Sequence, residues 1–380
     1  MNIFVVAGAV LTIITGLPYL LYLILYFVIR PSGSPIDKSF SEPPVSIVLP
    51  TYNEADIITN KLEDICSLEY PLDQIEVVIV DSSDDETPSL IREFFAERSH
   101  PTFQLIEETE RRGLAPALND GYAAASHEIV IKTDCDSYLD SAAIQEAVAN
   151  FSDPSVGAVT GQSVSVLGES KVETNYRGIQ AHIQMLESYL DSTLIFHGPF
   201  SAFRKEHIVK IDPNSLADDT ELALKIRRQG KRVIFDPAIH YQEAAHSAFM
   251  KRRQQKDRRG MGLIRLLIQH VDALGKFGNY GRIVLPFNWW FIIISPWFAV
   301  LTFFLLSIGI VIGFGVIGLI FPISILTFIW LGQRDRLGFL QALYALVDTQ
   351  ISLFRASILL LRGEEDGTWE IDAELRDKFE

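Results

Sequence analysis

The residues whose types and spacing first suggest chemistry are two aspartates, Asp134 and Asp136, with one residue between them. They directly follow the apolar, β-branched run Ile129 to Thr133, which predicts a buried strand. Hard divalent cations such as Mg²⁺ and Mn²⁺ prefer oxygen ligands and keep coordination sites open for phosphate oxygens. The pair is therefore a candidate holder for such a cation beside a diphosphate, and the alternative for these two residues alone is an ordinary solvated turn.

Two further polar clusters follow predicted strands. The run Val45 to Leu49 leads into Thr51 and Glu54, and the run Glu76 to Val80 leads into Asp81. Helical patterns alternate with these runs, which predicts an α/β domain with a mostly parallel sheet flanked by helices. Ligands bind beyond the carboxyl ends of such strands, so all three clusters should share one edge. No glycine-rich dinucleotide fingerprint or P-loop lysine motif is present, which disfavours a dinucleotide oxidoreductase or a P-loop NTPase.

Long stretches without charge indicate transmembrane helices at both ends of the chain. One lies within residues 1–30, and a second, residues 283–333, is too long for a single crossing and predicts two helices. A third apolar segment, residues 337–361, carries Asp348 and Arg355 on one helical face. We interpret it as an interfacial amphipathic helix, with a fourth span as the alternative.

The distribution of charge indicates on which side of the membrane the domain lies. The net charge of −15 argues against nucleic acid as a partner. Basic residues flank the paired spans, at residues 251–259 before them and at Arg334 after them, which predicts a cytoplasmic domain by the positive-inside tendency. Cys66 and Cys135 give no disulfide framework, in keeping with a reducing compartment.

The expected order is a transmembrane helix (1–30), a linker (31–44), a cytoplasmic domain (45–270), two transmembrane helices (283–333), the amphipathic helix or fourth span (337–361) and a solvated acidic tail (362–380).

The clusters belong to a longer series of motifs. They are VSIVLPTYNE at 45–54, EVVIVDSSDDET at 76–87, RGLAPALNDG at 112–121, GAVTG at 157–161, GPFSAFR at 198–204 and ADDTELAL at 217–224, followed by Gln255, Arg258, Arg259 and Gly262. In order and spacing these motifs, over about residues 45–262, resemble the family 2 inverting glycosyltransferases. The last four residues stand where membrane-bound members have Q-x-x-R-W and a glycine. The resemblance implies a GT-A-type fold for the domain.

The resemblance also implies donor-site roles. Thr51, Glu54 and Asp81 would line the nucleotide pocket, and Asp134 would contact the nucleotide sugar. Asp136, together with Asp134, would hold Mg²⁺ or Mn²⁺. The implied donor is a nucleotide-diphosphate sugar.

On the acceptor side, Asp219 of the pair Asp218-Asp219 stands at the position of the catalytic base. Without the resemblance, one of these aspartates could equally be an N-cap of the helix that follows. Gln255, Arg258 and Arg259 would lie at the acceptor and diphosphate end, and the alternative is a basic face at the membrane surface. Arg259 departs from the family's tryptophan, which removes any acceptor stacking that the tryptophan provides.

The predicted function is that of an integral membrane glycosyltransferase. It would move one sugar, with inversion and with metal dependence, to a lipid-linked or glycan acceptor. A processive polysaccharide synthase is the first alternative, because such synthases also combine membrane helices with a Q-x-x-R element; the few predicted spans and the missing tryptophan speak against it. An inactive membrane scaffold of the same fold is the alternative from another class. The sugar, the nucleotide and the acceptor stay open.

Overall fold

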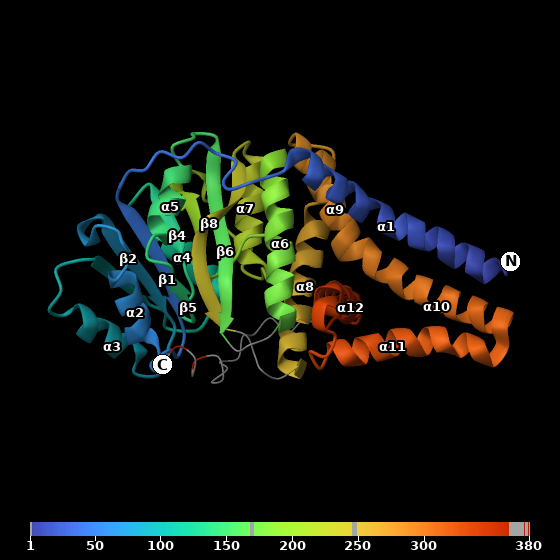
Figure 1. Cartoon of the computed structure of the whole chain (residues 1–380). Coiled ribbons are helices and arrows are strands. Elements are labelled where there is room, and N and C mark those ends of the chain that lie inside the picture. The colour runs from blue at the N-terminus through green and yellow to red at the C-terminus, as the bar shows by residue number, and fades with distance from the viewer. Residues whose placement is uncertain (1, 168–170, 245–248, 365–375, 377–378, 380) are drawn as a thin grey trace.

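The computed structural model describes residues 2–167, 171–244, 249–364, 376 and 379. It confirms the predicted fold class, because a single mixed sheet is flanked by helices and long apolar helices lie near both ends of the chain (Figure 1). The strands are β1 (Val45–Thr51), β2 (Ile75–Asp81), β3 (Thr102–Glu107), β4 (Ile129–Lys132), β5 (Ser137–Leu139), β6 (Val156–Leu167), β7 (Ser201–Arg204) and β8 (Arg232–Ala244).

The sheet order is β3-β2-β1-β4-β7-β6-β8-β5. Strands β1 to β4 run parallel, β7 runs antiparallel to both its neighbours, and β5 is an antiparallel edge strand. The parallel register pairs Thr51 with Asp81, and the antiparallel register pairs Lys132 with Ser201. The polar residues that follow β1, β2 and β4 therefore emerge at one edge of the sheet, as the sequence predicted.

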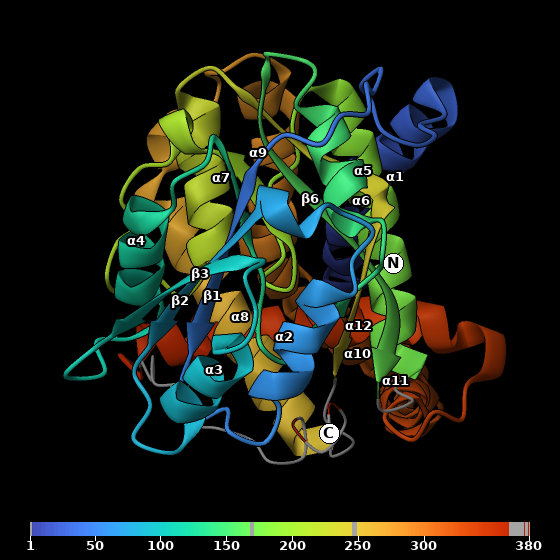
Figure 2. The same ribbon diagram turned by 90° about the vertical axis from the view of Figure 1, so that its left-hand side faces the viewer.

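Helices cover both faces of the sheet, which is why its central strands are apolar along their length. Figure 2 shows α2 and α3 on one side of the sheet and α4 and α7 on the other. Each face has its own core of buried aliphatic and aromatic side chains, with α5 packed on the same face as α2 and α3. These helices are α2 (Ile58–Cys66), α3 (Thr87–Phe95), α4 (Leu114–Ala124), α5 (Ala143–Asn150) and α7 (Asp218–Arg228).

A second layer joins this domain to the apolar helices. Helix α6 packs against the sheet and against α12, and α8 packs against α12, so the two long helices stand between the sheet and the projecting part of the molecule (Figure 1). The helices of this region are α1 (Ile3–Ile29), α6 (Lys171–Leu190), α8 (Phe249–Gln269), α9 (Leu285–Trp289), α10 (Ser295–Phe314), α11 (Ile320–Gly332) and α12 (Gln341–Leu361).

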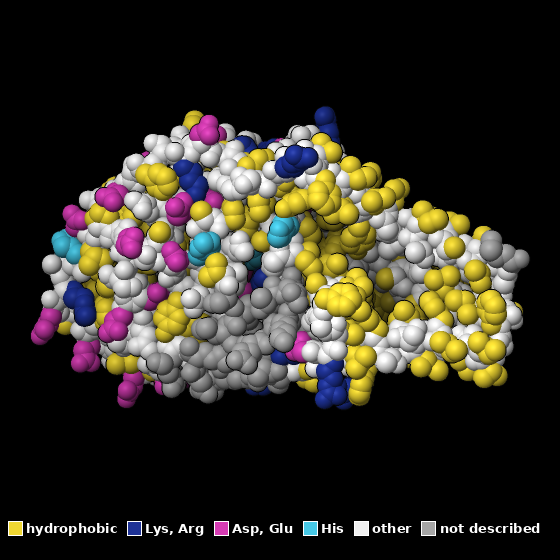
Figure 3. Space-filling view, in the orientation of Figure 1, with side chains coloured by type: hydrophobic (Ala, Val, Ile, Leu, Met, Phe, Trp, Pro, Cys, Tyr) yellow, Lys and Arg dark blue, Asp and Glu magenta, His cyan; other side chains and the backbone are white. Residues whose placement is uncertain are grey.

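Among the residues that the structure describes, three helical stretches are long and apolar enough to cross a membrane: α1, the stretch Tyr280–Gly332, and the stretch Gly338–Leu361. The second contains α10 and α11, joined by a tight 3₁₀ turn at Gly315–Leu319, and its crossing of the membrane in two passes stays a prediction. In Figure 3 hydrophobic side chains cover these projecting helices, whereas charged side chains gather on the opposite half of the molecule. Only 6% and 11% of the first two stretches is buried within the protein, against 44% of the third, which rests on α8 and α6.

Helix α1 lies close against α10 through two glycines. A Cβ on Gly8 would stand 2.6 Å from Leu306 Cδ2, and a Cβ on Gly309 would stand 2.8 Å from the backbone nitrogen of Val5. Small residues at such points let apolar helices approach closely enough for their side chains to interlock. This seam therefore fixes α1 to α10 and, through α10, to the rest of the molecule.

We expect Gly309→Leu to separate α1 from α10 and to cost about 1–3 kcal/mol of stability, since the new side chain meets backbone atoms that cannot give way. Gly313→Leu is the matched control, because a Cβ there meets nothing within 4 Å. Thermal unfolding in detergent should show a lower melting temperature for Gly309→Leu alone. Equal melting temperatures for the two variants would exclude this seam as a source of stability.

Candidate active site

The first predicted contact at the sheet edge is formed by Thr51 and Asp81. The Thr51 hydroxyl donates a 2.6 Å hydrogen bond to Asp81 Oδ1, and the Ser83 hydroxyl donates another of 2.6 Å to the same oxygen. Both Thr51 and Asp81 are buried, and the parallel register of β1 and β2 places them side by side. The two residues expected to line a nucleotide pocket thus lie together, and Asp81 is oriented by two hydroxyl groups.

Glu54 has a partner from the far end of the chain. The Arg376 guanidinium donates to both carboxylate oxygens of Glu54, with Nε 2.9 Å from Oε2. Burial raises the pKa of Glu54 to about 7, although the arginine acts in the opposite direction. Arg376 and Phe379 are both buried, and the Phe379 ring packs on Tyr138. These two described residues of the acidic tail lie against the domain rather than in solvent, where the sequence had placed the whole tail.

The centre of the site is formed by Lys132, the last residue of β4. Its buried ammonium lies 2.7 Å from Asp134 Oδ1 and 3.4 Å from Asp219 Oδ2, and it donates a 2.9 Å hydrogen bond to the carbonyl of Gly198. Gly198 faces all three side chains: a Cβ there would stand 2.6 Å from Asp134 Oδ2, 2.9 Å from Lys132 Nζ and 3.3 Å from Asp219 Oδ2. Asp134 and Asp219, which are 85 positions apart in the chain, therefore share one cation.

Asp219 lies in the first turn of α7 and is almost fully buried. Burial raises its pKa to about 7, Lys132 lowers it, and the neighbouring Asp218 and Asp134 raise it. Asp218 Oδ2 and Asp219 Oδ1 are buried and have no hydrogen-bond partner within the described residues. The N-cap of α7 is Ala217, without a side-chain cap, so neither aspartate has the N-cap role that the residues alone had left open. A carboxylate with a raised pKa and an open oxygen has the properties of a general base.

Asp136 follows Asp134 at the entrance to β5. Burial raises the pKa of Asp136, and the charge of Asp134 raises it further, so the second negative charge is disfavoured here without a cation. The nearest guanidinium nitrogen of Arg376 is 4.0 Å from Asp136 Oδ2, which is beyond hydrogen-bond distance. Within the described residues no group of three or more His, Cys, Asp or Glu side chains could hold a metal ion. The two carboxylates nonetheless fit a hard cation that takes its other ligands from phosphate and water.

Helix α8 places the predicted acceptor-side residues. Burial lowers the pKa of Arg258 while the charge of Asp218 raises it, which indicates that the guanidinium lies within electrostatic reach of the aspartate pair. Arg259 is half exposed, and its Nη2 lies 3.9 Å from Oε2 of Glu243, on β8. Gln255 is partly buried on the same helix, and its role stays a prediction.

Two residues of this site were not anticipated from the sequence. The sequence does contain a signal for Lys132, because a lysine at the end of an otherwise apolar buried strand needs a carboxylate partner nearby. It contains none for Arg376, since a basic residue in an acidic tail is most simply solvated. Both supply positive charge beside the carboxylates that the sequence predicted at this edge.

Comparison with known proteins identifies the family of the chain. The model of "Glycosyl transferase family 2" matches residues 46–211, and that of "Glycosyl transferase family group 2" matches residues 129–331. The second match covers more than half of the chain, so the chain belongs to glycosyl transferase family group 2. The class of protein defined by fold and family is therefore that of the glycosyltransferases.

Particular relatives are more distant. The poly-beta-1,6-N-acetyl-D-glucosamine synthase of Staphylococcus aureus (strain MSSA476) is 30% identical over 203 residues, which are 51% of this chain and 48% of that protein. The synthase of the same name from Staphylococcus epidermidis is 31% identical over 211 residues, 53% and 48% of the two chains. The chain thus spans about half the length of these curated relatives. Among solved structures, the mannosyltransferase PcManGT from Pyrobaculum calidifontis in complex with GDP-Man and Mn²⁺ matches with a TM-score of 0.77 and 27% identity, over 96% of this chain and 100% of that one.

We expect Lys132→Met to destabilise the protein by about 3–5 kcal/mol, because buried carboxylates lose their cation, and also to reduce activity per folded molecule. Lys38→Met is the matched control. Lys38 likewise joins two carboxylates, Glu146 and the buried Asp236, neither of which belongs to the site. Melting temperature and activity measured on the same preparations should show destabilisation in both variants and loss of specific activity only at Lys132. If the two variants keep equal specific activity, Lys132 has a purely structural role.

Proposed function

We propose that this chain is a membrane-anchored transferase that moves a single sugar, with inversion, from a nucleotide-diphosphate sugar to a lipid-linked acceptor. The observation that carries the proposal is the junction of Asp134 and Asp219 on Lys132, since it joins a donor-binding carboxylate to a candidate base. The fold and family support sugar transfer, and the likeness to PcManGT extends over nearly the whole of both chains.

The donor would lie along the edge formed by the ends of β1, β2 and β4. Thr51 and Asp81, at the ends of β1 and β2, form a hydrogen-bonded pair suited to the nucleotide, and Asp134 follows β4, the neighbour of β1 on its other side. Asp134 and Asp136 would hold Mg²⁺ or Mn²⁺, which would neutralise the leaving diphosphate as a Lewis acid. PcManGT was solved with GDP-Man and Mn²⁺ bound, and this supports a donor and a cation of the same kinds here.

Transfer with inversion is a single displacement. Asp219 accepts the proton of an acceptor hydroxyl, whose oxygen forms a bond to the anomeric carbon as the bond from that carbon to the diphosphate oxygen breaks. The bonding electrons leave with the nucleoside diphosphate, and Asp219 ends protonated. Lys132 keeps Asp219 oriented toward the donor side, and Arg258 on α8 offers positive charge to the departing phosphate. General base catalysis by one positioned carboxylate contributes about 10² to 10⁴ in rate.

A processive polysaccharide synthase is the second candidate, because the curated relatives bear such a name. The similarity to those synthases extends over 51% of this chain, and that to the mannosyltransferase PcManGT over 96% of it. Product size separates the two candidates. One added sugar supports single transfer, and a ladder of products supports the synthase.

The proposed topology has α1, α10 and α11 crossing the membrane and the sheet domain in the cytoplasm. In Figure 1 α12 is seen nearly end-on while α1, α10 and α11 run across the view, so α12 lies crosswise to them. Its larger buried share supports an interfacial position rather than a fourth span. Protease added outside intact cells should leave residues 45–270 uncut, and cleavage there would reverse the orientation.

We expect Asp219→Asn to abolish transfer while leaving donor binding largely intact, because an amide keeps the size of the side chain but cannot accept a proton. Asp136→Ala should instead weaken donor and Mn²⁺ binding, and chelator should stop transfer by the native protein. Calorimetry with the nucleoside diphosphate and a turnover assay on the same preparations measure both effects. Near-normal turnover of Asp219→Asn would move the base to Asp218, and full turnover in excess chelator would exclude the metal.

The raised pKa of Asp219 adds a pH dependence. A base must be deprotonated to work, and its pKa of about 7 means that activity should fall as the pH drops through about 7. The rate at saturating substrates should therefore be nearly constant above this range and decline about tenfold per pH unit below it. A profile that is flat down to about pH 5 would contradict the assignment of Asp219 as the base.

A further inference from the structure

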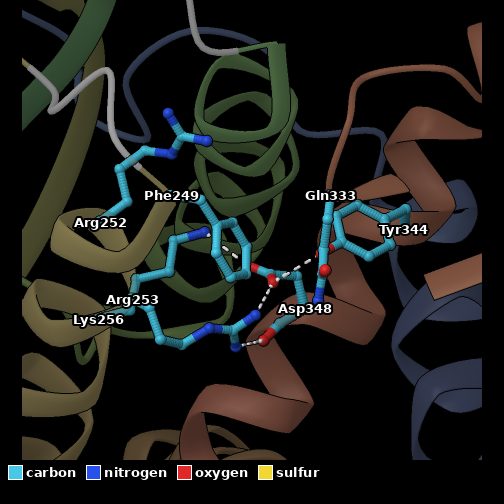
Figure 4. Close-up of a pocket in the computed structure, with 7 residues that line it drawn as sticks. All are labelled: Phe249, Arg252, Arg253, Lys256, Gln333, Tyr344 and Asp348. Atoms are coloured by element: carbon cyan, nitrogen blue, oxygen red, sulfur yellow. Dashed lines mark hydrogen bonds and ion pairs between the residues drawn. The ribbon is translucent and has the colours of Figure 1, made fainter. Parts of the chain in front are cut away.

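A second charged cluster lies away from the sheet edge, in a pocket where α8 meets α12 and the end of α11 (Figure 4). We call it the α8–α12 pocket. Helix α8 contributes Arg252, Arg253 and Lys256, and α12 contributes Tyr344 and Asp348. Three cations thus share the pocket with one carboxylate, so the pocket as a whole is positively charged and suits an anion.

The single carboxylate acts as a support for the cations. Asp348 binds Arg253 with one oxygen and Lys256 with the other, the latter at 3.0 Å, and it accepts a 3.0 Å hydrogen bond from the Tyr344 hydroxyl. Arg253 is held further by Ser352 at 2.8 Å. Long basic side chains normally lose conformational entropy when they bind an anion. Here two of the cations are already fixed, so an anion binding to the pocket would meet a preorganised site.

The surroundings of the pocket are those of a membrane surface. Gln333, which lines the pocket, directly follows the end of the apolar helix α11. In the next residue, Arg334, the guanidinium carbon lies 4.0 Å from the centre of the Trp330 ring, and tryptophan and basic residues are both common at the interface between lipid and water. Met250 on α8, Leu343 on α12 and Phe339, in the 3₁₀ turn just before α12, expose large apolar side chains. An anion bound here can therefore carry a hydrocarbon chain.

The same helix connects the pocket to the candidate base. Arg252, Lys256 and Arg259 follow one another at helical spacing along one face of α8. Arg258, within electrostatic reach of Asp218, is six positions after Arg252, or about 9 Å along the helix axis. The pocket therefore lies on the same helix as Arg258, nearer to its start, so that a lipid bound there would be held by the helix that also reaches the aspartate pair.

We propose that the α8–α12 pocket binds the phosphate headgroup of the lipid that carries the acceptor. The ligand class is a single-chain lipid monophosphate or diphosphate, with its chain along the exposed Phe339 and Leu343 and its headgroup at the mouth of the pocket, on Arg252 and Lys256. This inference rests on the proposed function, because it names the acceptor of that reaction. It places the specificity for the acceptor at the membrane end of α8, outside the sheet edge.

The test is a binding measurement that needs no turnover. Full-length protein in neutral detergent is titrated with farnesyl phosphate, and farnesol, inorganic phosphate and phosphatidylglycerol are titrated separately. We expect farnesyl phosphate to bind more tightly than the other three. Arg252→Gln together with Lys256→Gln should weaken it by at least about tenfold, the loss expected from one charge-assisted hydrogen bond. Arg362→Gln is the control, since Arg362 is an exposed cation just past the far end of α12.

Three outcomes would overturn the proposal: equal binding of phosphatidylglycerol, which would make the pocket a site for bilayer lipid; equal binding of inorganic phosphate; or an unchanged affinity in the double variant. Nucleoside diphosphate binding, measured on the same variants, should stay unchanged. Loss of farnesyl phosphate binding with an intact donor site would support the pocket even if no transfer is found. Failure of transfer in Asp219→Asn, with the pocket intact, tests the proposed function separately.

Discussion

The arrangement of the site depends on one buried ammonium group. Lys132 ends a strand whose other side chains are apolar, and Asp134 and Asp219 compensate its charge. Burying any of these charges without the others would be costly, so the three hold one another in place. The contact requires that Gly198 has no side chain, because a Cβ would occupy the space between them. The path of the chain before β7 is thus constrained by electrostatics at the end of β4.

Helix α8 connects the site to the apolar half of the molecule. At its start Arg253 and Lys256 are tied to Asp348, and one turn further Asp257 is tied to Arg355 at 2.9 Å, so ion pairs fix α8 to α12. Later in α8, a Cβ on Gly262 would stand 2.6 Å from the carbonyl oxygen of Leu216, just before α7. The helix that rests on the apolar segments therefore also touches the element that carries the candidate base. Displacing α12 should therefore shift α8 and, through the contact of Gly262 with Leu216, the start of α7.

Much of the fold could be predicted because its signals are local. Apolar, β-branched runs predicted the strands β1, β2 and β4 nearly to the residue, since such runs bury well in a sheet covered on both faces. The polar residues that follow them had to share an edge once the strands were parallel, and Thr51 and Asp81 do hydrogen-bond there. Charge-free length predicted two helices within residues 283–333, and the turn at Gly315–Leu319 does separate α10 from α11 there. The N-cap alternative for the aspartate pair failed because α7 begins one residue earlier than a cap would need.

By itself the sequence determined the fold class, the family and the set of carboxylates at the sheet edge, because these follow from local pattern and from the order of motifs. It did not determine which cations neutralise them. Lys132 meets Asp219 only because β7 returns antiparallel beside β4, and Arg376 meets Glu54 across 322 positions of the chain. The packing of α12 on α8 could not be predicted from the sequence either, since residues 338–361 are also apolar enough to cross a membrane. Pairings between distant residues depend on how buried charge is compensated in the assembled fold, and only the tertiary structure decides that.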